Sequence, residues 1–515
     1  MFSPNRRQLL QGLGAGLSLL TMPSFLVGCA KQGAPVASAQ APLGQNPFAQ
    51  WFGVDEALIR EVLTELGARG ATAADLYLQH TRSNSISMED GIVSAASSSI
   101  DQGAGLRVVI GDQTGFAFTE DLSRESLLAA ARTAAGIASG AAVVPPQALN
   151  MSPEGKLYAI AVPWADVGIT QKLPRLEYVE AKARGLDPNI EKVSIAWSDS
   201  EERVLIATLG GLIATDYRPM TRLWVNVTAN KSGVRQSNAS NVAGRHDFAW
   251  YTDERLDTVA KEAVDRTMRL FDAKRPPAGE LPVILAAGAS GILLHEAVGH
   301  GLEADFNRKK VSIYADMIGK SVAPDFVTIV DSAEEPFERG ALNVDDEGNE
   351  GRRTTLIQNG VLQSYIHDSI SARHYGVEPT GSGRRESFRF PPMPRMRCTF
   401  MEPGPHSKDE MIASVKKGII AETFTNGQVQ IGAGDFTFYI KNGWLIEDGK
   451  ITAPIKDCNI IGNGPDALKR VTMAAADARL DTGGWTCGKN GQSVPVSQGL
   501  PTVLVSSLTV GGEDA

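Results

Sequence analysis

The sequence predicts an α+β protein with two domains: an N-terminal domain of mixed helices and hairpins, and a β-rich C-terminal domain that carries a histidine motif. Three observations predict this class. Helical periodicity alternates with hairpins in the first half, which favours an antiparallel or mixed sheet over a doubly wound nucleotide-binding fold. Turn dipeptides separate β-branched runs in the second half. The proline pair Pro276-Pro277 marks the boundary between them.

The composition excludes several classes of protein. The 515 residues are 43% hydrophobic, which suits a globular chain rather than a disordered one. The 4 cysteines are too few for a disulfide scaffold. The formal net charge of −9 argues against nucleic-acid binding, because phosphate contacts require a basic surface.

Residues 1–28 are predicted to be an export signal. The adjacent Arg6 and Arg7, followed by a glycine- and leucine-rich apolar run, are typical of the twin-arginine route. The run ends at Cys29 in a lipobox-like context, so this cysteine is a possible lipid anchor. A membrane-spanning anchor is the alternative, but glycine and proline interrupt the run before it reaches about 20 residues. Residues 29–52 are predicted to be a flexible tether, because the stretch 30–50 is rich in small residues, contains proline and is nearly uncharged.

The N-terminal domain is predicted over residues 53–277. Periodicity and capping residues predict helices at 55–66, 123–132 and 252–271, with Ser123 as an N-cap. Alternating apolar runs predict hairpins at 106–119 and 204–215.

The C-terminal domain is predicted over residues 278–515. It opens with a strand at 282–285, a glycine turn and a helix from Ile292. Hairpin turns are predicted at three dipeptides: Asn359-Gly360, Asn442-Gly443 and Asp448-Gly449.

The opening helix of this domain contains His295, Glu296 and His300. The familiar zinc motif places two histidines four residues apart, on one face of a helix. Here the interval is five, which rotates the second histidine by about 140° on a regular helix. For both to bind one ion, the helix must widen or end between them, and Gly299 most readily allows this.

Two imidazoles suit zinc, and a catalytic zinc has three protein ligands plus water. Glu296, beside the first histidine, is placed to take a proton from that water. The alternative is that the histidines are ordinary helix residues without a metal. The residue chemistry leaves the third ligand open among Glu303, Asp305, His367, His374, Cys398, Cys458 and Cys487. Of these, His367 and His374 are expected at the surface.

Residues 295–309 resemble the signature of the TldD/PmbA family of metallopeptidases, on the TldD side. Further matches occur in order along nearly the whole chain: 100–107, 114–117, 345–348, 379–387, 392–396, 487–489 and 508–512. The resemblance implies a zinc-dependent peptidase. It makes His295 and His300 the histidine ligands, Cys487 the thiolate ligand and Glu296 the catalytic glutamate.

The resemblance also implies a partner and a substrate class. Subunits of this type pair, so a homodimer or a heterodimer with a sister subunit that lacks the metal motif is expected. In such pairs the active site faces an enclosed cavity between the subunits, which implies unfolded or short peptide substrates. Familiar members are cytosolic, so the export signal is a departure. We expect a periplasmic or envelope location, with the cytoplasm as the alternative. Cys398 and Cys458 are expected to be either disulfide-bonded or buried free thiols.

Two other matched segments have alternative interpretations. Asp345-Asp346-Glu347 is either an ion site or, more simply, a solvated turn. Arg384 and Arg385 either bind a substrate carboxylate or form structural ion pairs.

Three functions follow from the sequence. The leading one is a zinc peptidase in which Glu296 activates a zinc-bound water. The alternatives are an exported zinc amidase acting on cell-wall peptides, and a non-catalytic envelope lipoprotein with structural zinc.

Overall fold

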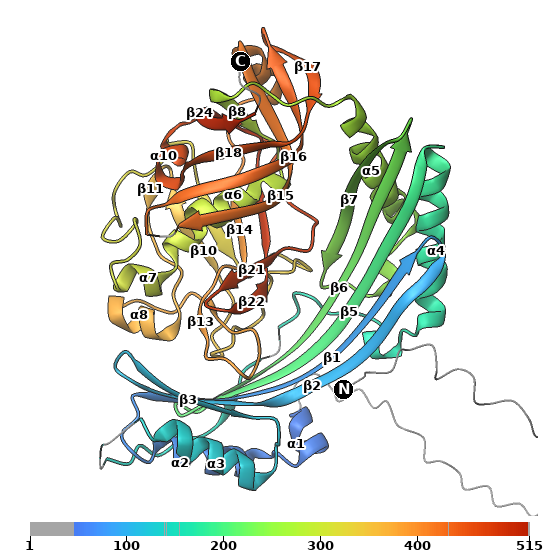
Figure 1. The fold of residues 1–515 in the computed structure, drawn as a ribbon. Coiled ribbons are helices and arrows are strands. Elements are labelled where there is room, and N and C mark those ends of the chain that lie inside the picture. The colour runs from blue at the N-terminus through green and yellow to red at the C-terminus, as the bar shows by residue number, and fades with distance from the viewer. Residues whose placement is uncertain (1–45, 138–139, 141, 154, 431, 513–515) are drawn as a thin grey trace, which may run out of the picture. The chain divides into compact units, whose positions relative to one another are not determined.

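The computed structural model describes residues 46–137, 140, 142–153, 155–430 and 432–512 (Figure 1). The predicted export signal, Cys29 and most of the predicted tether lie outside the described residues. The predicted α+β class is confirmed, since helices and largely antiparallel sheets are mixed along the chain. Within the described part, none of the helices combines the length and the apolar character needed to cross a membrane.

The first sheet contains seven strands in the order β3-β2-β1-β5-β6-β4, with β7 also paired to β6. Its strands are β1 (Ala73–Glu89), β2 (Ile92–Ile110), β3 (Gln113–Thr119), β4 (Asn150–Met151), β5 (Ile190–Thr208), β6 (Leu212–Lys231) and β7 (Val234–Gly244). The predicted hairpins are present, but β5 and β6 have 19 and 20 residues, far more than predicted. The polar residues in their middle obscured these lengths in the sequence.

The two faces of this sheet have different partners because side chains alternate along each strand. On β1, Leu76 and Leu78 face one way, into a core with α2 (Glu56–Gly67) and α3 (Arg124–Ala135). Tyr77, between them, faces the other way and packs against the C-terminal residues Val344 and Phe388.

Further along the helix-covered face, α4 (Ile169–Leu186) and α5 (Asp253–Asp272) pack on the sheet. The expected N-cap of α3 is confirmed, since Ser123 accepts a hydrogen bond from a backbone amide of the first turn. Helix α4 escaped prediction because it contains Pro174 and has little amphipathic character. The tether predicted up to residue 52 is wrong at its end, because the short helix α1 (Pro47–Phe52) forms before α2 and buries Phe48.

The C-terminal residues build two larger sheets. One has the order β15-β8-β24-β18-β16-β17, with β19 on β24, and β15 also pairs with β16, so five strands close into a ring. The other has the order β11-β10-β9-β14-β23-β20. The bounds in the first are β8 (Gly279–Leu285), β15 (Lys417–Gln430), β16 (Asp435–Glu447), β17 (Lys450–Ile455), β18 (Cys458–Asn463), β19 (Val471–Ala474) and β24 (Val503–Gly511). Those in the second are β9 (Ile329–Ser332), β10 (Arg353–Gln358), β11 (Val361–Leu362), β14 (Cys398–Met401), β20 (Arg479–Leu480) and β23 (Ser497–Leu500).

Two small ribbons and several short helices complete this half. The ribbons are β12 (Gly383–Arg384) with β13 (Met393–Pro394), and β21 (Thr486–Lys489) with β22 (Gln492–Pro495). The helices are α6 (Ile292–Leu294), α7 (Ala304–Arg308), α8 (Ser369–Tyr375), α9 (Lys408–Ser414) and α10 (Gly464–Lys469). Helix α6 continues directly into the histidine motif, and its leucines are buried in the main C-terminal core.

Two of the three predicted hairpin turns are confirmed. Asn359-Gly360 joins β10 to β11, and Asp448-Gly449 joins β16 to β17, all with positive φ. The prediction for Asn442-Gly443 is wrong, because this dipeptide lies inside β16. The Asn442 side chain is buried and bonds the backbone carbonyl of Arg266 at 3.2 Å, so its amide serves packing rather than a turn.

Asp345-Asp346-Glu347 is not a solvated turn, because all three residues are buried. Asp346 accepts a hydrogen bond from Arg218 of β6 at 2.7 Å, and Glu347 accepts one from Arg107 of β2 at 2.8 Å. The carboxylates thus pair with arginines on the face of the first sheet opposite its helices. Sequence spacing could not reveal this, because the partners lie more than 100 residues away along the chain.

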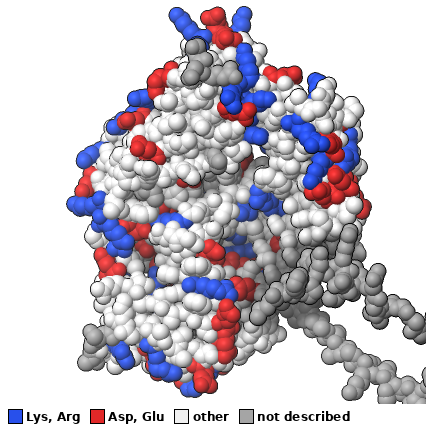
Figure 2. Space-filling view, viewed as in Figure 1, with Lys and Arg blue, Asp and Glu red and all other residues white. Residues whose placement is uncertain are grey.

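Basic and acidic side chains are interspersed on the molecular face in view (Figure 2).

Candidate metal centre

The histidine motif forms a wide helical turn, as its spacing predicts. After α6 the backbone continues as one π-helical turn over His295–Gly299, and the amide of His300 bonds the carbonyl of His295. This turn absorbs the extra residue between the histidines, so both rings project to the same side. Gly299 was expected to allow this widening through its conformational freedom, and this reason is wrong. Its φ of −58° suits any residue, but an added Cβ would lie 1.9 Å from Sδ of Met396.

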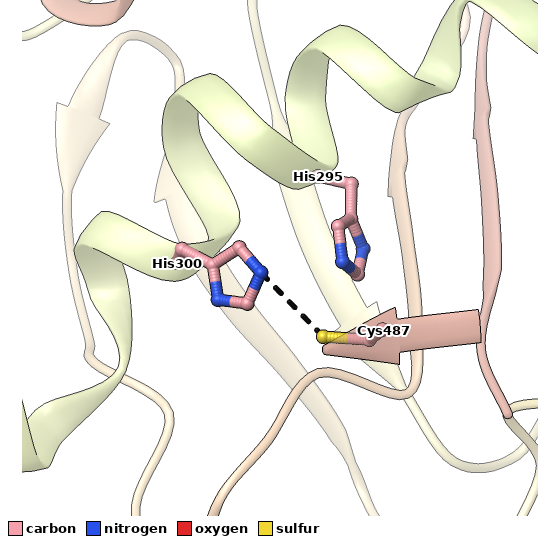
Figure 3. A group of neighbouring side chains, drawn as sticks. All are labelled: His295, His300 and Cys487. Carbon is pink, nitrogen blue, oxygen red and sulfur yellow. Dashed lines mark hydrogen bonds between the residues drawn. The ribbon is translucent and has the colours of Figure 1, made fainter. Parts of the chain in front are cut away.

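His295, His300 and Cys487 meet across two elements far apart in sequence (Figure 3). One potential ligand atom from each lies within 4.8 Å of the other two. Sγ of Cys487 lies 3.5 Å from Nε2 of His300. Cys487 lies on β21, opposite Val494 of β22, so the ribbon presents the sulfur to the helical turn. All three residues are buried.

The donor set fits a zinc ion. Zinc bonds to imidazole nitrogen and thiolate sulfur are about 2.0–2.3 Å long, so tetrahedral ligand atoms lie about 3.5 Å apart. The sulfur–nitrogen separation matches this value. In addition, Nδ1 of His295 is buried without a hydrogen-bond partner among the described residues. A buried polar nitrogen of this kind is costly unless a further group satisfies it.

Charges around the cluster favour the thiolate form of Cys487. Burial alone would raise the pKa of this thiol, but His295 and His300 hold it well below its usual range. Burial likewise opposes the charged form of His300, yet Glu303 and Cys487 raise the pKa of this imidazole well above its ordinary value. Since the thiolate is the form that binds metals, these charges make Cys487 suited to metal binding.

Glu303 orients His300 rather than joining the cluster. One of its carboxylate oxygens lies 2.9 Å from Nδ1 of His300, which leaves Nε2 facing Cys487. Although burial would raise it, the pKa of Glu303 is lowered to about 2 by Lys489 and His300. Lys489 lies 3.1 Å from Glu303 and 2.7 Å from Asp305, so both acids pair with this lysine.

Glu296 lies at the margin of the three potential ligands. Its carboxylate is 4.0 Å from Nε2 of His300, and its side chain is 19% exposed, in contrast to the buried histidines. A carboxylate placed beside the ligands, but outside their cluster, can accept a proton from a water molecule there.

Two arginines in family-matched segments lie near the site. Sequence reasoning missed Arg395. Arg384 was expected to bind a substrate carboxylate or to form an ion pair, but it donates to backbone carbonyls instead. Arg395 donates to the backbone carbonyl of Cys487 at 2.5 Å, and Arg384 donates to that of Pro495 at 2.7 Å. Together they hold both strands of the ribbon that carries the sulfur. A charge so far from Cys487 in sequence gives no signal of this contact by itself. Arg385 lies 3.3 Å from Asp75 of β1, which favours the structural ion pair over the substrate contact.

The remaining ligand candidates are not brought to the cluster. His374 is exposed, as expected. The expectation is wrong for His367, which is buried, and its burial lowers its pKa to about 4. Cys398 and Cys458 are buried free thiols.

Family models of the PmbA/TldA metallopeptidase match domain 1 over residues 74–138, the central domain over 162–271 and the C-terminal domain over 278–512. The "Metalloprotease TldD homolog" of Haemophilus influenzae is 41% identical over 86% of this chain and 94% of its own length. The "Zinc metalloprotease TldD homolog" of Saccharolobus solfataricus is 28% identical over 86% of this chain and 97% of its own.

A solved structure shows the same fold. The crystal structure of TldE from Thermococcus kodakarensis superposes with a TM-score of 0.67, covering 88% of this chain and 100% of that one, at 19% identity. The fold and the relatives together define a metallopeptidase, a hydrolase that acts on peptide bonds. The chain belongs to the PmbA/TldA metallopeptidase family.

Proposed function

We propose that the chain is a zinc peptidase that hydrolyses short or unfolded peptides. The observation that carries this proposal is the buried cluster of His295, His300 and Cys487 with Glu296 at its margin. The name of the Saccharolobus relative, a zinc metalloprotease, supports the choice of metal.

In this proposal each residue has a separate task. His295, His300 and Cys487 hold the ion, and Glu303 fixes the ring of His300. A bound zinc supplies Lewis-acid chemistry, which polarises the scissile carbonyl and makes water more acidic. Glu296 accepts the proton of the attacking water and delivers it to the leaving amine.

A purely structural zinc is disfavoured by the number of ligands. Structural sites are closed by four protein ligands, whereas catalytic sites have three and an open position. Within the described part of the chain, the cluster has three residues. This supports a catalytic ion over the lipoprotein alternative.

The test replaces Glu296 with Gln, a substitution that keeps the shape of the side chain but removes its basicity. We expect zinc binding to be retained and cleavage of casein fragments to fall by at least about 100-fold. Unchanged cleavage would overturn the assignment. Parallel assays on muropeptides distinguish the zinc amidase, which would cleave these and leave casein fragments intact.

We further propose that the protein acts in the cell envelope and pairs with a second subunit. Arg6, Arg7 and Cys29 support export and lipid anchoring, and the structural likeness to TldE supports pairing. Replacing both arginines with lysine is expected to retain the protein in the cytoplasm with residues 1–28 attached. Fractionation and intact mass measure this. A wild-type protein that stays cytoplasmic and uncleaved would contradict export, and a monomeric mass for the active protein would contradict pairing.

A further inference from the structure

A cavity of about 1330 Å³ lies beside the ribbon that carries Cys487. One wall comes from β6, β7 and α5 of the first half, and the other from β15 and residues 477–485. The lining of the cavity thus reaches Gly484 and Trp485, which lie three and two residues before Cys487. Because an extended chain spans at most about 3.6 Å per residue, Gly484 is no more than about 11 Å from Cys487 along the backbone.

Arg222 of β6 lines this cavity and touches the loop before Cys487. Its guanidinium lies over the ring of Trp224, 4.8 Å from the ring centre. A Cβ at position 484 would lie 2.6 Å from Nε of Arg222, so a larger residue here would force the arginine to shift. Asn241 of β7 fixes the contact, because its side-chain oxygen accepts from Nε of Arg222 at 3.2 Å and from the amide of Gly484 at 2.7 Å.

The two terminal nitrogens of Arg222 have no hydrogen-bond partner among the described residues, and no carboxylate there forms an ion pair with this arginine. Burial accordingly lowers the pKa of Arg222. The contrast is Arg107, where Asp75 and Glu347 raise the pKa in spite of burial. A planar guanidinium that is stacked on an aromatic ring, with its outer edge free, is suited to bidentate binding of a carboxylate.

Other arginines lie near Arg222. One is Arg339, which donates to the carbonyl of Trp485 at 3.3 Å, and Arg245 lies near Arg339 in turn. Burial, Arg222 and Arg245 together lower the pKa of Arg339 to about 10. No carboxylate within the described ranges pairs with Arg245 or Arg339. Three carboxylates of the cavity wall pair with basic side chains: Glu262 with Arg266, Asp265 with Lys261 and Glu422 with Arg269. Two others accept hydrogen bonds from uncharged groups: Asp477 from Thr502 and Asp481 from Trp485.

We propose that Arg222 determines specificity by binding a carboxylate of the peptide substrate in this cavity, within a few residues of the bond that is cleaved. The inference rests on the proposed peptidase function and extends it, since it names a chemical class of substrate. The carboxylate is supplied either by the C-terminus of the peptide or by an acidic side chain.

The experiment uses Arg222→Gln and a matched control, Arg269→Gln. Arg269 lines the same cavity and lies 4.7 Å from the ring centre of Trp444, but Glu422 already pairs with its charge. Each protein is assayed on one hexapeptide in four forms: free C-terminus, C-terminal amide, an internal Glu, and Gln in its place. Binding of the same peptides to Glu296→Gln protein is followed by tryptophan fluorescence, which requires no turnover.

We expect Arg222→Gln to raise KM by about 10- to 100-fold for the peptide that carries the recognised carboxylate. KM for the counterpart without that carboxylate, the C-terminal amide or the Gln peptide, should stay unchanged. Arg222→Lys, which retains the charge but not the planar fork, should give an intermediate loss. If amidation of the C-terminus raises KM of the protein with Arg222 intact, Arg222 binds the C-terminal carboxylate. If replacing Glu with Gln raises it, Arg222 binds the acidic side chain.

Equal binding of carboxylate and neutral peptides to the protein with Arg222 intact would overturn the proposal. So would a loss in Arg222→Gln that is the same for all four peptides, or a selective loss that Arg269→Gln reproduces. If the wild-type protein cleaves none of the peptides, the peptidase function fails, while the fluorescence comparison still decides whether Arg222 binds a carboxylate.

Discussion

An oxygen of the Glu303 carboxylate lies 2.9 Å from Nδ1 of His300, and the carboxylate is fully buried. This contact fixes the orientation of the imidazole, so that its other nitrogen faces Cys487. Groups that hold a metal ligand in this way commonly change metal affinity without touching the ion.

Replacing Glu303 with Gln is therefore expected to weaken zinc binding by about 10- to 100-fold, because the amide holds the imidazole less firmly than the carboxylate does. Competition with a chromophoric chelator measures the affinity. Asp305→Asn is the control, since Asp305 bonds Lys489 but forms no hydrogen bond with the described histidines. Equal affinities for all three proteins would show that Glu303 does not support the site.

Gly299 is required by packing against Met396, whose side chain is fully buried. Gly299→Ala is expected to lower the free energy of unfolding by about 1–3 kcal/mol, because the added methyl overpacks this contact. Urea unfolding measures the change. Gly488→Ala, next to Cys487, is the matched control, since a Cβ there meets no atom within 4 Å. A Gly299→Ala protein as stable as the control would contradict the packing argument.

The buried Asp345 makes stability depend on pH. Burial and the charge of Glu347 raise its pKa from 3.8 to about 7. Because the folded state then holds the proton more tightly than the unfolded state, this group lowers the free energy of unfolding as pH rises from about 4 to about 7. Urea midpoints across that range should fall more steeply for the wild type than for Asp345→Asn. Parallel slopes would show that Asp345 does not titrate in the folded protein.

Parts of the structure that depend on local sequence could be predicted. The N-cap of α3 at Ser123 and the widened turn between His295 and His300 follow from residue type and spacing, and the structure has both. The turn at Asn442-Gly443 was predicted wrongly, because a buried contact with Arg266 overrides the local preference.

The sequence contains no comparable signal for contacts between segments that are far apart along the chain. The chemistry of the residues left seven candidates for the third ligand, and only the family resemblance favoured Cys487. The structure brings this residue to the histidines from 187 positions beyond His300. The support from Arg395, and the contact of Arg222 with Gly484, likewise depend on the arrangement of the sheets in space.

The central claim is that His295, His300 and Cys487 together bind one zinc ion. The most direct measurement is the zinc content per chain of the purified protein, before and after Cys487→Ala, with Cys458→Ala as the control at a buried free thiol away from the cluster. We expect about one zinc per chain in the wild type and in Cys458→Ala, and a large loss in Cys487→Ala. Full retention of zinc by Cys487→Ala would contradict this claim.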